Sequence, residues 1–208
     1  MPSFSDRTID RFKKQLTGGG ARSNLFEVSF GDSFDSGKFD FPGDIGSVEA
    51  SHNMLIKTAG LPASTISEIP VPFRGRTLKI AGDRTFDVWS ITVINDTDFK
   101  WRNIFERWMN YIVKVSDGSG SINPNDYQVN AIVSQLSRGP GSALSTAGNT
   151  NSTKIESLRS YKLCGLFPTN VSQIELSYNN ENEIEEFTVD LQVQWWEAYD
   201  GTNSGQVI

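Results

Sequence analysis

Two groups of acidic residues are the first candidates for chemistry in this sequence. Four aspartates fall within a Gly-rich segment, at Asp32, Asp35, Asp40 and Asp44. Their spacing does not match the ligand positions of a calcium-binding loop, so a solvated acidic loop is the better interpretation. Four glutamates cluster farther along the chain, at Glu181, Glu183, Glu185 and Glu186. They could supply the carboxylate pair of a glycoside hydrolase, but their place at an expected hairpin favours surface charge.

One glycine-containing segment has a superficial likeness to a phosphate-binding loop. It consists of Gly82, Asp83, Arg84 and Thr85. The segment lacks the Gly-Lys-Ser/Thr ending of such a loop and leads into strand periodicity rather than a helix. The glycine run at residues 18–20 has no strand before it and does not match a dinucleotide-binding turn. Neither segment predicts a nucleotide site.

Cysteine and histidine chemistry is limited to Cys164 and His52, the single residue of each type. One cysteine excludes an intrachain disulfide, and these two residues are too few for a His/Cys metal site. A nucleophile pair would require the fold to bring the two together, so a buried thiol and an incidental histidine are the simpler interpretation. The sequence therefore predicts no catalytic residue, no metal ion and no cofactor, and it favours a structural or binding protein over an enzyme.

The composition favours a folded domain with a packed core. Of the 208 residues, 37% are hydrophobic and 21% are charged, which is enough apolar material to make wholesale disorder a poor interpretation. The formal net charge of −6 predicts no general attraction to nucleic-acid phosphates or to anionic lipids. The sequence shows neither a signal-peptide apolar region nor a run as long as a membrane span, so we expect folding in a reducing cytoplasm without a membrane partner.

Alternating hydrophobicity predicts a mainly antiparallel β domain. The clearest strand covers residues 184–196, where one face is expected to carry Phe187, Val189, Leu191, Val193 and Trp195. Residues 179–182 are its expected hairpin turn. Further strands are expected at residues 24–30, 54–59, 77–80, 86–94, 127–136, 155–166 and 171–178.

One helix stands out, over residues 98–115. Its apolar residues recur at intervals of three and four, at Trp101, Ile104, Phe105, Trp108, Met109, Ile112 and Val115. Thr97 is the expected N-cap. We expect this stripe to pack against a sheet rather than to hold a cofactor.

Several stretches depart from the strand pattern. Residues 1–20 combine a loosely helical apolar spacing with a terminal glycine run, which predicts an N-terminal arm and hinge. Residues 21–200 are the predicted β domain, with loop excursions at 31–50 and 137–154, and residues 201–208 are a C-terminal tail. The Pro-rich segment 61–84 is either an exposed connector or an ordinary hairpin that turns at Gly82 and Asp83.

An ordered set of short blocks between residues 24 and 197 resembles the tail tube proteins of T4-like contractile bacteriophages. The blocks are Asn24-Leu25-Phe26-Glu27-Val28, Lys57-Thr58-Ala59-Gly60-Leu61-Pro62, Ile69-Pro70-Val71-Pro72-Phe73, Gly82-Asp83-Arg84-Thr85-Phe86-Asp87-Val88-Trp89, Val93-Ile94-Asn95-Asp96, Gly165-Leu166-Phe167-Pro168-Thr169-Asn170-Val171, and Asn182-Glu183-Ile184 leading to Phe187. The resemblance implies an antiparallel β-sandwich or barrel-like tail-tube fold with one flanking α-helix. It also implies subunits that close into hexameric rings, which stack into a hollow virion conduit inside a contractile sheath.

The resemblance implies partners as well. They are further copies of the chain, the tail sheath protein, and the baseplate and tail terminator proteins, assembled in the host cytoplasm; DNA would pass through the lumen without specific binding. Three alternatives stay open. They are a baseplate tube-initiator paralogue or secretion-system tube subunit with the same fold, a small hydrolase, and a monomeric carbohydrate- or peptide-binding β-sandwich.

Two sets of residues are the predicted assembly sites. The charges of segment 61–84 are expected to contact a neighbouring subunit or ring, at Arg74, Arg76, Lys79, Asp83 and Arg84. The polar strand faces are expected to line the lumen, at Gln128, Asn130, Ser134, Glu186, Asp190 and Gln192. A hydrated, non-basic wall offers no anchor to DNA phosphates.

Overall fold

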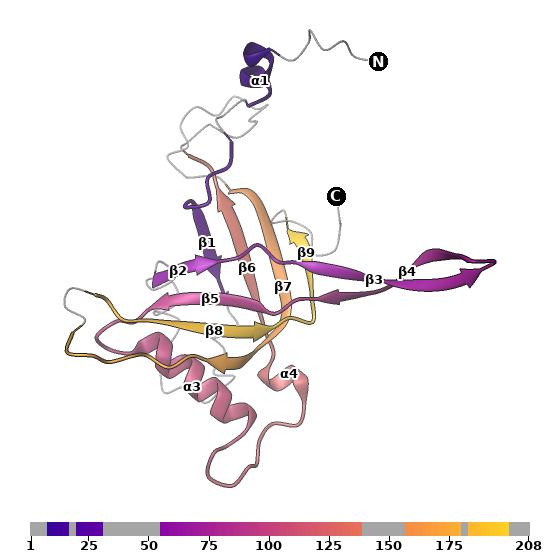
Figure 1. Cartoon of the computed structure of the whole chain (residues 1–208). Helices are drawn as coiled ribbons and strands as arrows, with labels where there is room; N and C mark the ends of the chain where they lie inside the picture. The colour runs from indigo at the N-terminus through magenta and orange to yellow at the C-terminus, as the bar shows by residue number, and fades with distance from the viewer. Residues whose placement is uncertain (1–7, 17–19, 31–54, 139–156, 180–182, 200–208) are drawn as a thin grey trace.

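The computed structural model describes residues 8–16, 20–30, 55–138, 157–179 and 183–199 (Figure 1). The described strands are β1 Phe26–Ser29, β2 Ile56–Ala59, β3 Ser64–Phe73, β4 Arg76–Phe86, β5 Trp89–Ile94, β6 Val129–Leu136, β7 Ser157–Val171, β8 Glu186–Gln192 and β9 Trp195–Tyr199. The described helices are α1 Ile9–Gln15, α3 Lys100–Ile112 and α4 Pro124–Tyr127. Each strand pairing is antiparallel, which confirms the predicted mainly antiparallel β fold.

The main sheet has the strand order β1-β6-β7-β8-β5-β2 and bends in the middle of β7. The first part of β7 pairs with β6 and β9, whereas its last residues pair with β8. In Figure 1, β6 and β7 run upright while β5 and β8 run across, so the two halves of the sheet cross. The bend lies at Gly165, whose φ of +67° is a conformation that favours glycine. One bent sheet therefore wraps around a single core.

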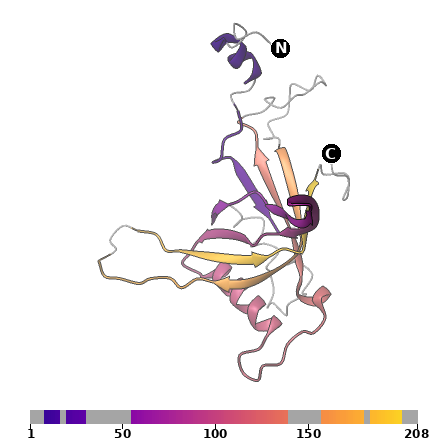
Figure 2. The same cartoon turned by 45° about the vertical axis from the view of Figure 1, so that its right-hand side comes forward.

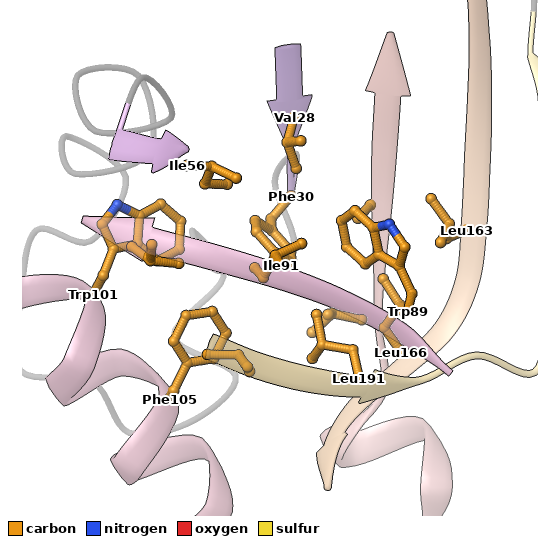
Figure 3. Close-up of a cluster of buried hydrophobic side chains, with 14 of the residues drawn as sticks. Val28, Phe30, Ile56, Trp89, Ile91, Trp101, Phe105, Leu163, Leu166 and Leu191 are labelled. Atoms are coloured by element: carbon orange, nitrogen blue, oxygen red, sulfur yellow. The ribbon is translucent and has the colours of Figure 1, made fainter. Parts of the chain in front are cut away.

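The core fills the inner side of this bent sheet and is closed by α3 (Figure 3). Alternate strand residues are buried there, including Trp89, Ile91 and Val93 of β5, Val129, Ala131 and Val133 of β6, and Phe187, Val189 and Leu191 of β8. The Phe30 ring contacts three aromatic neighbours, with centroids 5.7 Å from Trp101, 6.4 Å from Phe105 and 6.5 Å from Trp89. Burial of each large apolar side chain contributes roughly 1.5–3 kcal/mol, so this cluster holds the two half-sheets and the helix together.

Helix α3 confirms the predicted aromatic stripe but is shorter than predicted. It spans 13 residues and buries Trp101, Ile104, Phe105 and Trp108. The expected N-cap at Thr97 is wrong, because Phe99 takes the N-cap position with φ of 55°. Asp96 supplies the capping contact instead, since its Oδ1 accepts the Lys100 N–H at 3.0 Å. At the other end Val113 is extended, which stops the helix before the predicted limit at residue 115.

All three predicted closing strands are wrong in extent. Strand β7 continues to Val171, and no strand follows in the predicted range up to residue 178. The predicted strand 184–196 divides into β8 and β9, because the chain passes there from one half-sheet to the other and the Gln194 N–H binds the Cys164 carbonyl at 3.2 Å. Trp195 consequently faces away from the core, contrary to prediction, and is 52% exposed.

Strands β3 and β4 form a separate hairpin. Its turn is Arg74-Gly75, with φ of 46° and 78°, as a tight hairpin turn with two left-handed residues requires. The predicted turn at Gly82 and Asp83 is wrong. These two residues form a bulge opposite Ser67 within β4, where a Cβ on Gly82 would lie 2.5 Å from the Ser67 Oγ.

The predicted loop excursions, C-terminal tail and hairpin turn lie mostly outside the described residues. The loop excursions 31–50 and 137–154 lie there apart from Ser137 and Arg138, as does the tail 201–208. Of the predicted turn 179–182, only Asn179 is described. The division into arm, β domain and tail stays a prediction. Among the described helices, none is both long and apolar enough to cross a lipid bilayer.

Candidate assembly surfaces

The β3–β4 hairpin projects from the body of the protein and pairs with no other described strand (Figures 1 and 2). Its contacts with the rest of the described chain lie near its root. There the Trp196 Nε1–H donates to the Ala63 carbonyl at 3.0 Å, and the Trp196 ring meets Phe86 edge to face at 6.4 Å. Beyond Ser64, all residues of β3 are exposed. The base of this hairpin therefore packs against the body of the protein, whereas the rest of β3 is exposed.

One face of the hairpin is apolar. The register places Ile69 opposite Ile80 and Val71 opposite Leu78, with Phe73 next on the same face. These five side chains are between 38% and 65% exposed. An isolated two-stranded hairpin is at best marginally stable in water, and a contiguous exposed apolar face marks an interaction surface. The structure thus presents a surface that needs a partner.

The opposite face of β3 carries Pro70 and Pro72, which limit how that partner can bind. In a two-residue hairpin the residues flanking the turn, here Phe73 and Arg76, exchange hydrogen bonds. The prolines therefore occupy positions whose N–H groups would point away from β4. Since proline has no N–H, the outer edge of β3 is blocked for strand addition. The two prolines therefore favour a partner that binds the apolar face of the hairpin rather than the edge of β3.

The structure brings the predicted contact residues together on this hairpin. Arg74 and Arg76 flank the tip, and the Arg74 guanidinium lies 5.4 Å from the Phe73 ring centroid. Lys79 is paired within the hairpin, 2.8 Å from Glu68. Asp83 lies in the bulge and Arg84 opposite Ile66, both exposed. The two tip arginines thus have no acidic partner in the part of the chain that the structure describes.

The predicted lumen residues of β6 and β8 share the outer face of the bent sheet. Asn130 and Ser134 alternate with the buried residues of β6, and Glu186, Asp190 and Gln192 alternate with those of β8. Acids outnumber lysines on this face. It carries Glu27, Glu186, Asp190 and Glu197 against Lys57 and Lys162. The surface is accordingly polar and not basic.

Asp190 is held by two neighbours on this outer face. The Ser90 hydroxyl donates to its Oδ1 at 2.5 Å, and the Asn170 amide donates to its Oδ2 at 3.0 Å. These hydrogen bonds, first from Ser90 and then from Asn170, lower the pKa of Asp190 below its ordinary value. Glu186 is also engaged, since the Lys57 ammonium lies 2.5 Å from its Oε1.

Two other predicted lumen residues lie at the bend of the sheet. Asn130 Oδ1 accepts the Gly165 N–H at 3.2 Å, and Gln128 Oε1 lies beside the same glycine. Ser134 is farther along β6, where its hydroxyl lies 2.8 Å from that of Ser160. Gln128 follows the short helix α4 and is the member of the set that precedes β6. The six residues are therefore spread along the outer face rather than gathered into one pocket.

A further surface was not predicted from the sequence. Residues 172–179 and 183–186, here called the acidic segment, lie between β7 and the start of β8, and residues 174–178 and 183–186 line a cavity of about 620 Å³. Leu176, Tyr178 and Ile184 are exposed on it, beside the carboxylates of Glu175 and Glu183. The apolar residues at 174, 176 and 178 alternate as in a strand, which is why the sequence predicts a paired strand there. Because this stretch pairs with no described strand, Leu176 and Tyr178 are exposed, whereas Ile174 is half-buried against the core.

The residues with catalytic potential are not assembled into a site in the described part of the chain. Burial raises the pKa of the Cys164 thiol, and His52 lies outside the described residues. Glu185 accepts a hydrogen bond from Asn95 at 2.9 Å, and Glu186 pairs with Lys57. Within the described ranges no three His, Cys, Asp or Glu residues lie close enough to hold a metal ion.

Comparison with known proteins decides the family. A family model described as "Phage tail tube protein" matches residues 21–199. The chain belongs to this family. Tail tube protein gp19 of Enterobacteria phage T4 is 34% identical over 170 residues, which is 79% of this chain and 95% of that protein. The tail tube protein of Serratia phage KSP90 is 28% identical over 188 residues, 88% of this chain and 93% of that protein. The predicted resemblance is confirmed.

Solved structures share the fold. A chain of the anti-feeding prophage baseplate superposes with a TM-score of 0.55 at 13% identity, covering 88% of this chain and 98% of that chain. A chain of the sheath/tube terminator of an extracellular contractile injection system gives a TM-score of 0.54 at 12% identity, covering 87% and 97%. These likenesses confirm the predicted tail-tube fold and concern the fold alone.

Proposed function

We propose that this chain is the repeating subunit of the inner tail tube of a contractile phage, in which six copies close into a ring and the rings stack into a hollow conduit. Membership of the tail tube family supports the tube, and the family resemblance implies six copies. The observation that carries the proposal is the apolar face of the β3–β4 hairpin, which no described residue of the same subunit covers. A second copy of the chain is the partner that a homopolymer always supplies.

The outer face of the bent sheet is proposed as the lumen wall. Gln128, Asn130, Ser134, Glu186, Asp190 and Gln192 lie on or beside it. Its lysines are matched or outnumbered by acids, so DNA phosphates find no cluster of cations to bind. A polar wall of this kind lets DNA slide through during ejection without being held.

The hairpin is proposed as the contact between subunits of successive rings, with Arg74, Arg76, Lys79, Asp83 and Arg84 among the contact residues. An exposed ion pair contributes only about 0–1 kcal/mol. Stacking must therefore rely on the apolar face and on repetition of each contact around the ring. The sheath, baseplate and tail terminator proteins are the further partners, and the role of the subunit is structural rather than catalytic.

Negative-stain electron microscopy of the purified chain at increasing concentration tests this function. We expect hollow tubes or stacked rings of uniform diameter. Single rings that never stack would indicate a baseplate tube initiator instead. A well-folded monomer at high concentration would contradict the proposal.

A further inference from the structure

The acidic segment combines exposed apolar side chains with carboxylates that have no partner among the described residues. Leu176 is 77% and Ile184 70% exposed, and both line the same cavity as Tyr178. Glu175 and Glu183 also line this cavity and have no ion pair or side-chain hydrogen bond with the described residues. Carboxylates left beside exposed apolar groups favour an occupant that is both apolar and cationic.

The tip of the β3–β4 hairpin has this chemistry. Phe73 and Leu78 are exposed on its apolar face. Arg74 in the turn and Arg76 next to the turn have no acidic partner among the described residues. The cavity at the acidic segment has a volume of 620 Å³, and pockets of about 300–1,000 Å³ accommodate groups of drug size. Several side chains of the tip therefore have room there.

The hairpin and the acidic segment extend from opposite ends of the strand pair β5–β8. Strand β5 pairs with β8 from Trp89↔Leu191 at one end to Ile94↔Glu186 at the other. The hairpin precedes Trp89, whereas the acidic segment runs into Glu186. In Figure 1 the hairpin extends to the right and the acidic segment to the left, and in Figure 2 they again point in different directions.

This separation excludes contact within one subunit. Six paired residues at about 3.4 Å per residue put roughly 17 Å of sheet between the two surfaces, and each points away from the other. Two complementary surfaces at different ends of one molecule make a heterologous contact, in which each copy donates one surface and receives the other. Such a contact closes a ring where the rotation between copies closes, and otherwise extends a stack.

We propose that the tip of the β3–β4 hairpin of one copy binds the acidic segment of a second copy in the next ring, with Arg74 and Arg76 facing Glu175 and Glu183 and the apolar side chains of both surfaces buried between them. This inference rests on the proposed tube and names the receiving surface for its stacking contact.

Charge exchange tests the pairing. The variant Arg74→Glu/Arg76→Glu and the variant Glu175→Lys/Glu183→Lys each place like charges across the contact. We expect each to reduce the sedimentable polymer at least tenfold, and the chain that carries all four substitutions to recover tubes. The matched control is Arg107→Glu/Lys114→Glu, at and beyond the C-terminal part of α3, which is expected to polymerise as the unmodified chain does.

The results separate the two proposals. If the unmodified chain forms no rings or tubes, the proposed function fails. If it forms tubes and either charge-reversed variant polymerises equally well, the pairing is wrong while the tube stands. Loss in both variants without recovery in the combined chain also overturns the pairing, because the two surfaces are then needed for different contacts.

A cross-link identifies the receiving surface directly. A photo-reactive phenylalanine analogue in place of Phe73, activated in assembled tubes, is expected to link to the acidic segment of another copy. The linked peptides are identified by mass spectrometry. A link to α1 or to any other segment instead would overturn the proposal.

Discussion

Val71 lies directly opposite Leu78 on the hairpin, and both side chains point to the face that no described residue of the subunit covers. Leu78→Asp places a carboxylate in the middle of this face. If the face is buried in the tube, the charge costs several kcal/mol, and each 1.4 kcal/mol is a tenfold loss of association. We expect on the order of a hundredfold less polymer by sedimentation, with unchanged folding of the monomer.

The neighbouring residue supplies the control. Thr77→Asp adds the same charge one residue away, on the opposite face of the hairpin beside Pro72. It is expected to leave polymerisation within a few-fold of the unmodified chain. Equal loss in both variants would contradict a specific role for the apolar face.

Gly165 provides a test of the sheet bend. Its φ is +67°, and a Cβ at this position would lie 2.5 Å from the Gln194 Cγ. We expect Gly165→Ala to lower the free energy of unfolding by about 1–3 kcal/mol, measured by denaturant titration in the Leu78→Asp background, where the chain stays dissociated. Gly60→Ala is the control, because nothing lies within 4 Å of a Cβ there and no left-handed φ is involved. An unchanged midpoint for Gly165→Ala would show that the bend tolerates a side chain.

Phe105 tests the junction between helix and sheet. It is fully buried, stacks on Trp101 and Trp108, and meets Phe187 edge to face at 6.4 Å. We expect Phe105→Ala to cost roughly 3–5 kcal/mol of unfolding free energy, since truncation leaves a cavity among rings that cannot collapse into it. Arg107→Ala, on the exposed side of the same helix, is expected to change stability by less than about 0.5 kcal/mol. Similar losses in both variants would contradict the assigned packing.

Asp190 gives a pH-dependent prediction. Its pKa is lowered, so its contribution to stability is present above its ordinary pKa of 3.8 and is lost as the pH falls through the lower folded-state value. Ser90→Ala removes the first of the two hydrogen bonds and is expected to raise the pKa of Asp190 toward 3.8. The measurement is a carboxyl NMR titration in the Leu78→Asp background. Ser116→Ala, at an exposed position, should leave the titration of Asp190 unchanged. An identical titration of Asp190 in the Ser90 variant would show that this hydrogen bond does not form in solution.

The sequence predicted those parts of the fold that depend on local periodicity. The alternation in β8 and the three-four spacing of Trp101, Ile104, Phe105 and Trp108 both survive in the structure, because each burial pattern is set within one element. Val193 faces the core whereas Trp195 does not. This change could not be predicted in the same way, because it follows from the pairing of β9 with the first part of β7.

The assembly surfaces were predictable only in part. Pro70, Pro72 and the nearby cations indicated that the hairpin is exposed, and the predicted contact residues lie on it, although their role in assembly stays a prediction. The turn was misplaced because Gly82-Asp83 has the composition of a turn, whereas the register uses it as a bulge. The acidic segment was missed for a related reason. Its alternation resembles that of a paired strand, and only the three-dimensional structure shows that its partner is absent among the described residues.

The charge of the proposed lumen wall gives the last prediction. Gln192 lies on the outer face of β8 near Asp190, and Gln192→Lys would place one added cation per subunit along the conduit. Phosphates passing such a wall exchange their counterions for lysines, so we expect slower DNA ejection from virions built with this variant, and partial recovery at higher salt because screening weakens the contact. Glu106→Lys on the exposed side of α3 is the control, since it adds a cation away from the sheet. Ejection kinetics that are the same for both variants and independent of salt would contradict the placement of the outer sheet face at the lumen.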